Sequence, residues 1–398
     1  MASCKAPNTP QKTSGGTSRH VKAIFAVVAV LGLTGGIFWW LGLGSYLVQR
    51  VGYAGRAETF AGKSEQLKQT VIVPTLDSPC PPNKNIIWCS SFQLAWNEIR
   101  DKVIGAPLKV VGAEEVAARL NTAKQSSSDL DPKSLYVAGG WIKDGIVEKI
   151  KKDMAVKFPS HVLPDFSGFD DGLLAYSYLV ACVPFEHPFR QVNEGLVFKD
   201  SQGAGIDVEA FGLSKIDEGG YRKIREQVAV LYCRRSDAPD AHGEMNEYAI
   251  DLCRSSRPYE VVVALVEPKG SLAQTLEYVR LQMQEPKSRG YSDKTPALGT
   301  NDVLRVPEMV WRIDHRFSEL IGKTLANVNI PIVEALQTTA FRLDRCGAML
   351  KSEAVFAATR SPKHFVFDRP FLVYMQKRGA EQPFFVMWVD NAELLTRR

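Results

Sequence analysis

The chain has 398 residues, 45% of them apolar and 23% charged, which is an ordinary globular composition and enough length for one large domain or two smaller ones. Its 49 Lys and Arg residues exceed its 44 Asp and Glu residues by only five. Residues 1–22 hold four of these net positive charges, so the rest of the chain is almost neutral. It lacks the basic excess that nucleic-acid-binding proteins direct at phosphates.

The N-terminal region divides into three predicted parts. Residues 1–20 are basic and rich in Ser, Thr, Pro and Gly, which is typical of a disordered tail. Residues 23–49 carry no charge and would form a helix about 40 Å long, more than the roughly 30 Å of a bilayer's hydrocarbon core. We therefore predict a transmembrane signal-anchor helix over 21–49, because the run is too long for a cleaved signal peptide. A polar juxtamembrane linker is predicted at 50–70.

The main domain is predicted to span residues 71–398. The basic residues before the apolar span weakly favour an extracytoplasmic position for this domain. Apolar periodicity predicts helices at 90–105, 112–123, 144–158 and 271–283, and strands at 172–183, 226–235, 246–253 and 259–268. Strands also dominate the last hundred residues. Helices before strands predict an α+β order and not alternating βαβ units.

Seven cysteines are present, and Cys4 lies in the tail. In an exported domain an even number of the others could form disulfides, although their spacing is irregular. Cys80 and Cys89 bracket a Pro-rich turn and are favoured as a pair. Most of the others lie in apolar strands, where buried thiols are expected. The six cysteines of the main domain are Cys80, Cys89, Cys182, Cys233, Cys253 and Cys346.

The C-terminal third carries the clearest motifs. The stretch "HFVFDRPFLVYM", 364–375, holds Arg-Pro-Phe between two apolar strands, and "FFVMWVDNAELL", 384–395, reads as a closing strand. Before them, "LRVPEMVWRIDHRFSELIGKTL", 304–325, reads as a strand with a helix after it, and "TTAFRLDRCGAMLKSEA", 338–354, as a strand that leads into a loop. In this order the segments resemble the serpins. Looser matches extend the resemblance over about residues 80–398. The resemblance implies an α+β, serpin-like fold with a helical N-terminal part and two or three mostly antiparallel β-sheets.

The resemblance implies structural roles for Phe367, Arg369, Pro370 and Phe371. They would form a bend between two sheets, where a proline removes no ladder hydrogen bond. Arg369 would pair locally or cap carbonyls, and Phe371 would fill the core. The chain departs from the family at Cys89-Ser90, where serpins have Ser-Pro, and the segment before Asn85 is too short for the family's first helix.

The resemblance also implies an exposed reactive loop, which a protease cleaves and which then inserts as a strand in the main sheet. Its hinge would be Gly347, Ala348, Met349, Leu350 and Lys351. Arg360-Ser361 is the candidate scissile bond for a trypsin-like enzyme. The alternate residues from Ala348 to Ala358 carry no charge, so insertion with that face inward buries none. Bulky hinge residues and a short loop should nevertheless slow insertion.

No enzyme signature stands out. The sequence has no H-E-x-x-H, C-x-x-C, G-x-S-x-G or P-loop motif. The acidic, His-containing loop 236–244 matches no metal-binding spacing, and a solvated turn is favoured there. We therefore expect no catalytic residues, metal or cofactor. The favoured function is that of a membrane-anchored, non-inhibitory serpin-like protein with a protein partner and no nucleic acid. The alternatives are a suicide inhibitor of a trypsin-like serine protease and an unrecognised hydrolase.

Overall fold

The computed structural model describes residues 58–168, 171–213, 221–235, 245–284, 297–299, 301–345 and 363–398. The chain divides into two compact units, 1–56 and 57–398, and every described residue belongs to the second. The predicted tail and the predicted transmembrane helix at 21–49 lie outside the described residues. Within the described ranges, no helix is both long and apolar enough to cross a membrane.

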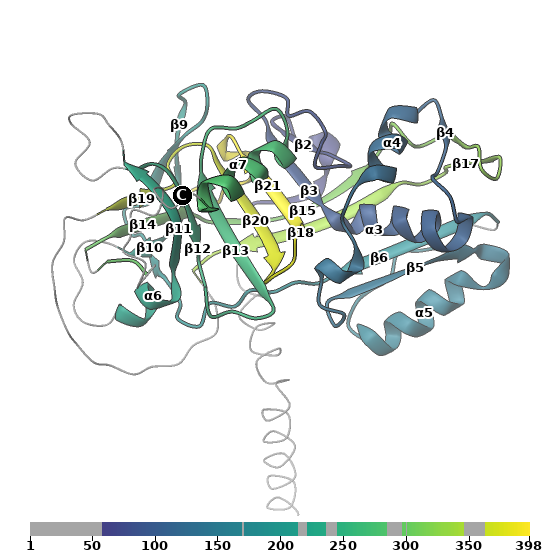
Figure 1. Ribbon diagram of the computed structural model, residues 1–398, viewed down its shortest axis with the longest axis horizontal. Coiled ribbons are helices and arrows are strands. Elements are labelled where there is room, and N and C mark those ends of the chain that lie inside the picture. The colour runs from purple at the N-terminus through teal and green to yellow at the C-terminus, as the bar shows by residue number, and fades with distance from the viewer. Residues whose placement is uncertain are drawn as a thin grey trace, which may run out of the picture. The chain divides into compact units, whose positions relative to one another are not determined.

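The largest sheet has seven strands and forms the centre of the unit (Figure 1). Only the pair β2–β3 is parallel. The middle strands are apolar on both faces because the main core covers one face and α7 (Leu272–Gln284) covers the other. The strands follow the order β11 (Ala229–Arg235), β12 (Met245–Asp251), β13 (Tyr259–Leu265), β20 (Phe371–Lys377), β21 (Pro383–Val389), β3 (Asn85–Cys89) and β2 (Thr70–Ile72).

A four-stranded sheet packs against the same core. Its order is β19 (His364–Val366), β14 (Val303–Pro307), β10 (Ala210–Leu213) and β7 (Arg190–Gln191). Gly212 in β10 faces Arg305 in β14, and a Cβ atom there would lie 1.8 Å from the carbonyl oxygen of Leu304. Only glycine therefore allows β10 and β14 to approach this closely.

A three-stranded sheet joins the start of the unit to its C-terminal half. β1 (Phe60–Lys63) runs parallel to β15 (Met309–Arg316), and β15 runs antiparallel to β18 (Leu336–Leu343). Besides the β5–β6 hairpin, two minor sheets complete the described fold. One is three-stranded, with the order β17 (Ile330–Pro331), β16 (Thr324–Leu325) and β4 (Val110–Val111). The other is the hairpin of β8 (Leu196–Lys199) and β9 (Gly205–Val208).

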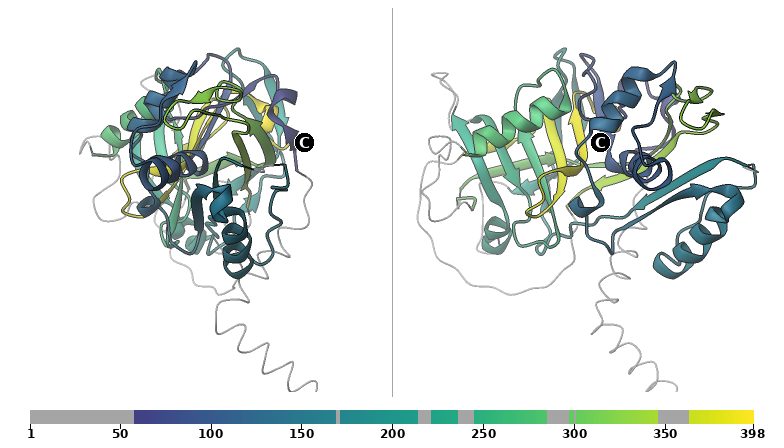
Figure 2. Two further views of the ribbon diagram at one scale, coloured as in Figure 1. Left: turned by 90° about the vertical axis from the view of Figure 1, so that its right-hand side faces the viewer. Right: turned by 45° about the vertical axis from the view of Figure 1, so that its right-hand side comes forward.

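The hairpin of β5 (Leu135–Trp141) and β6 (Leu173–Leu179) carries its own small core. α5 (Ile146–Lys157) lies along it, as Figure 2 shows, and buries Ile146, Val147, Ile150 and Met154 at helical spacing. These side chains pack on Tyr136 and Ala138 of β5.

Two further helices bring the hairpin and the core together. α3 (Ser90–Glu98) continues as a π-helical turn, η2 (Ile99–Ile104), and packs on β5 and β6. The Gln93 amide in α3 donates to the carbonyl of Leu120 in α4 (Glu114–Thr122) at 2.7 Å. The short helix α6 (Arg222–Gln227) precedes β11. Single 3-10 turns lie at Ser64–Gln66, Ser127–Asp129, Ile142–Asp144 and Ala392–Leu394.

The predicted α+β class with mostly antiparallel sheets is confirmed, as are the four predicted helices and the main strands. The helix expected after the strand of segment 304–325 is wrong. Phe317 and Leu320 enter the core there, and turns carry the chain to β16 through Gly322, whose φ is +78°. Strands β1 and β2 begin within the segment 50–70 that the sequence assigned to a linker.

Cys80 and Cys89, the pair that the sequence favoured if a disulfide forms, are not bonded to each other. Both residues carry free thiols, Cys89 buried at the end of β3 and Cys80 half-buried near Leu272. Burial raises the pKa of Cys80 to about 11, so its thiol is protonated at neutral pH. Cys182, Cys233 and Cys253 are reduced as well, and Cys346 lies outside the described residues.

Candidate functional site

The site predicted from the sequence is the segment between β18 and β19. Its hinge, Gly347 to Lys351, and the bond Arg360-Ser361 lie in residues 346–362, outside the described part of the chain. The structure describes the two attachment points of this segment and the strands beside them. The acidic loop 236–244 is likewise not among the described residues.

The departure point at the end of β18 is held by a buried ion pair. The Arg342 guanidinium lies 2.5 Å from the Asp344 carboxylate, whose side chain is only 3% exposed. One residue later, the carbonyl of Arg345 accepts a hydrogen bond from the Phe189 amide at 3.1 Å. The chain therefore leaves the sheet from a fixed position, because side-chain and main-chain bonds both hold it.

Asp302 fixes the residue at which the segment rejoins the described fold, Lys363. Its Oδ1 accepts from the Lys363 amide and its Oδ2 from the Gly299 amide, both at 2.8 Å. Arg225, itself 5% exposed, donates to the carbonyls of Gly299 and Asp302 at 2.7 and 2.8 Å. The Val303 amide then donates to the Lys363 carbonyl at 2.8 Å, which starts the parallel pair β14–β19. Both ends of the segment are thus fixed, and they lie in different sheets.

Two of the described strands, β18 and β6, have an unpaired edge. Among the described strands, β18 pairs with β15 alone and β6 pairs with β5 alone. The β6 sequence, "LLAYSYL", has no charge, and all seven residues are half-buried. An open edge presents unpaired N–H and C=O groups and can accept another strand. The arrangement is therefore suited to strand addition.

Polar groups gather where α3 begins. The Gln337 amide of β18 donates to the Cys89 carbonyl at 3.0 Å and to the Ser91 hydroxyl at 2.9 Å. In the described part of the chain, the buried hydroxyl groups of Ser90 in α3 and Ser177 in β6 have no hydrogen-bond partner. A buried hydroxyl group without a hydrogen-bond partner is costly in an apolar interior. The hydrogen bonds of this part of the core are therefore not fully satisfied.

The Arg-Pro-Phe motif lies at a crossing between sheets. β19 ends at Val366 in the four-stranded sheet and β20 begins at Phe371 in the seven-stranded sheet. Phe367 and Phe371 are fully buried, with ring centroids 5.3 Å apart, and Pro370 lies between the two strands. Arg369 contacts the Asp368 carboxylate at 3.4 Å and the carbonyls of Met245 and Asn246 at 3.3 and 3.4 Å.

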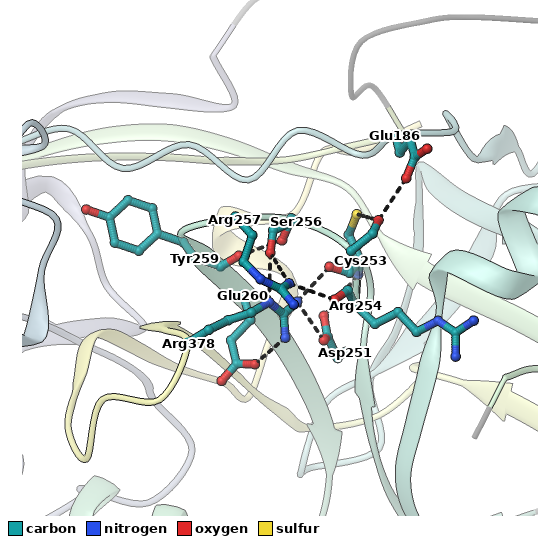
Figure 3. Close-up of polar contacts among 10 residues, drawn as sticks. Glu186, Asp251, Cys253, Arg254, Ser256, Arg257, Tyr259, Glu260 and Arg378 are labelled. Atoms are coloured by element: carbon teal, nitrogen blue, oxygen red, sulfur yellow. Dashed lines mark hydrogen bonds and ion pairs between the residues drawn. The ribbon is translucent and has the colours of Figure 1, made fainter. Parts of the chain in front are cut away.

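The charged cluster around Arg378 is structural (Figure 3). Arg378 donates to Asp251 at 2.8 Å, to Glu260 at 2.7 Å, and to the carbonyls of Cys253 and Ser256 at 2.7 and 2.8 Å. Burial raises the pKa of the Asp251 and Glu260 carboxyl groups, and Arg378 opposes this change. Since the guanidinium satisfies both carboxylates, the cluster closes the ends of β12, β13 and β20. Sequence reasoning missed it, because Arg378 simply follows an apolar strand.

One contact has the form of a nucleophile and its base. The Ser64 hydroxyl lies 2.8 Å from Nδ1 of His315, and burial lowers the pKa of His315. Within the described ranges, no carboxylate is hydrogen-bonded to His315, and no group of three metal-binding side chains is present. A catalytic triad also needs an orienting group and an oxyanion site. The pair therefore links the 3-10 turn Ser64–Gln66 to β15, and nothing in its geometry marks an active centre.

No family model and no curated protein sequence matches the chain. Three solved structures with similar folds are protease nexin-1 with heparin, thyroxine-binding globulin with thyroxine, and Serpin48, a highly specific serpin of the insect Tenebrio molitor. Their sequence identities are 12%, 10% and 11%, and their TM-scores are 0.43, 0.42 and 0.40. The alignments cover 78%, 78% and 77% of this chain and 93%, 93% and 92% of theirs. Similarities of this size assign no partner and no activity to this chain.

Proposed function

We propose that this chain is a membrane-anchored, serpin-like protein that acts by contact with another protein and does not inhibit proteases. The observation that carries the proposal is the attachment of residues 346–362. They leave the edge strand β18 beside the Arg342–Asp344 pair and return at Asp302 in another sheet. A connecting segment whose two ends are held by the fold is a natural contact surface for a partner.

The residues of the segment favour a non-inhibitory role. A strand that enters beside β18 would need about as many extended residues as the eight of β18 itself, so length does not forbid insertion. Met349, Leu350 and Lys351 would enter first, and their bulk must pass between packed strands. Entry would be slow, and a protease would leave before it was trapped.

The alternative, a suicide inhibitor cleaved at Arg360-Ser361, has one observation in its favour. The open edges of β18 and β6 can pair with an added strand, and the alternate residues from Ala348 to Ala358 carry no charge. An unrecognised hydrolase has less support, since the Ser64–His315 pair lacks the groups that a hydrolase requires.

The decisive experiment is a thermal melt of the full chain before and after limited trypsin treatment. Cleavage after Arg360 is confirmed by mass spectrometry, and the variant Arg360→Ala, which removes that site, is the matched control. We expect an unchanged melting temperature after cleavage. A large rise, with both fragments retained and no rise in Arg360→Ala, would reverse the proposal in favour of loop insertion and inhibition.

The membrane part of the proposal has its own test. The full chain and a variant lacking residues 21–49 are expressed in cells, and membranes are washed with alkaline carbonate. We expect the full chain to stay in the membrane pellet and the variant to be released. If external protease digests residues 57–398 in intact cells, the main domain is extracytoplasmic; release of the full chain by carbonate would refute the anchor.

A further inference from the structure

A lysine and a cysteine meet directly after the segment 346–362. Nζ of Lys363 lies 3.9 Å from Sγ of Cys233. Lys363 immediately precedes β19 in the four-stranded sheet, whereas Cys233 belongs to β11 in the seven-stranded sheet. The contact therefore joins two sheets, and its two residues are far apart in the sequence.

The backbone on both sides of this contact is fixed. Lys363 is held by Asp302 through its amide and by Val303 through its carbonyl. Cys233 is paired with Tyr248 in β12, and the Tyr248 hydroxyl donates to the Val366 carbonyl of β19 at 2.8 Å. β19 is thus attached to β11 and β12 near both of its ends. Because the backbones are pinned, the amine and the sulfur stay within reach of one another.

The environment suits oxidation of the sulfur. Cys233 is 6% exposed, and Lys363 is half-buried. A neighbouring ammonium group stabilises a thiolate, which is the form that reacts with peroxide.

We propose that Cys233 and Lys363 form an oxidative cross-link when the protein meets hydrogen peroxide. The Cys233 thiolate takes one oxygen from peroxide to give a sulfenic acid, and the departing hydroxide takes a proton from the Lys363 ammonium group and leaves as water. The neutral Lys363 amine then attacks the sulfur, forms an S–N bond, and the sulfenic oxygen departs as a second water. One peroxide, one thiol and one amine thus give the cross-link and two waters.

The cross-link would fasten β11 to the start of β19. The downstream end of segment 346–362 would then be covalently attached to the seven-stranded sheet, beyond the hydrogen bonds of Asp302. A thiol reductant would restore the amine and the thiol. This inference does not depend on whether the protein inhibits a protease, because it concerns the anchor of the segment and not its fate after cleavage.

The test treats the full chain with hydrogen peroxide, blocks remaining thiols, digests the protein and maps cross-linked peptides by mass spectrometry. We expect a peptide pair joining Cys233 and Lys363 that has lost two hydrogens. Dithiothreitol should restore the separate peptides. Lys363→Arg keeps the positive charge and should abolish the pair, as should Cys233→Ser, whereas Cys80→Ser should leave it unchanged.

Two results would overturn the inference. One is a Cys233 that stays a thiol or climbs to sulfinic acid with Lys363 unmodified. The other is a cross-link of the same yield in Lys363→Arg, which would place the bond elsewhere. The peptide map of the unsubstituted chain decides the first result without any variant, so a variant that fails to fold does not leave the question open.

Discussion

The two carboxylate oxygens of Asp302 are divided between Lys363 and Gly299, each accepting one backbone N–H at 2.8 Å. One buried side chain thus fixes the residue at which the chain returns to the fold. Asp302→Ala would leave two amides without this acceptor, at a cost of about 1–3 kcal/mol each. We expect a lower urea midpoint and faster proteolysis near residue 363. Asp144→Ala, at an exposed aspartate, is the control and should change neither.

The Arg342–Asp344 pair should matter more than an ordinary surface ion pair. Asp344 is 3% exposed, so Arg342→Ala would leave a buried carboxylate without its cation. Breaking a buried pair on one side costs about 3–5 kcal/mol. A double-mutant cycle with Asp344→Ala in equilibrium unfolding measures the coupling. Additive losses in the double variant would show that the two side chains act independently.

In the Arg-Pro-Phe motif, we expect substitution of Phe371 to lower the stability strongly and substitution of Arg369 to lower it little. Phe371 is fully buried, and Phe371→Ala should cost about 3–5 kcal/mol because it opens a cavity. Arg369 is 46% exposed on its side chain and its contacts are long, so Arg369→Ala should cost less than about 1 kcal/mol. Urea unfolding of the two variants compares them directly. The opposite order would mean that Arg369 does more than cap carbonyls.

The long periodic elements could be predicted from the sequence because burial and periodicity coincide in them. α5 buries the four residues that its spacing selects, and β13 is the apolar strand that "YEVVVAL" indicates. The helix prediction for segment 317–325 was wrong because Phe317 and Leu320 have the spacing of a helical face, whereas the chain turns at Gly322. The strand β1 was not predicted because "FAGK" is only four residues long and shows no clear alternation, and its pairing with the distant β15 makes it a strand.

The sequence predicted only part of the candidate site. The position of the segment between two strands follows from local pattern, as does the bend at Pro370. Its anchors do not, since Asp302 is an ordinary aspartate until Gly299 and Lys363 are brought to it by the fold. Likewise no local signal joins Cys233 to Lys363 or Ser64 to His315, because each contact spans more than a hundred residues.

Gly212 should be among the least replaceable glycines described. The methyl group of Gly212→Ala would overlap the Leu304 carbonyl, which is backbone and must move with the whole of β14. We expect a loss of at least about 1–3 kcal/mol or failure to fold. Gly168→Ala is the matched control, since a Cβ there meets nothing within 4 Å. Equal melting temperatures for the two variants would contradict the close approach of β10 and β14.

His315 should make the protein sensitive to acid. Burial lowers the pKa of the folded His315 below its ordinary value of 6.5, so the unfolded chain binds the proton more readily. Stability present above the ordinary pKa is therefore lost as the pH falls toward the lowered folded value. His315→Gln keeps a partner for Ser64 but does not titrate. In urea unfolding at about pH 7.5 and about pH 5.5, the variant should lose less stability than the unsubstituted chain.

The contribution of His315 to the pH dependence of stability can be separated from the contributions of the other titrating groups. Burial also lowers the pKa of His161, and raises those of Asp251 and Glu260, but all three are unchanged in His315→Gln. The difference between the two proteins therefore isolates His315. An identical pH dependence would mean that His315 accepts its proton as easily when folded as when unfolded.

The three adjacent strands β1, β15 and β18 place the beginning of the folded unit next to its most distinctive segment. β1 follows directly on residues 58–59, where the Thr59 amide donates to the Val310 carbonyl, and β18 is the strand from which residues 346–362 depart. Only β15 separates them. A pull on the chain ahead of Thr59 would therefore load the hydrogen bonds of β15 first, and tension at the N-terminal side would reach the departure point across a single strand.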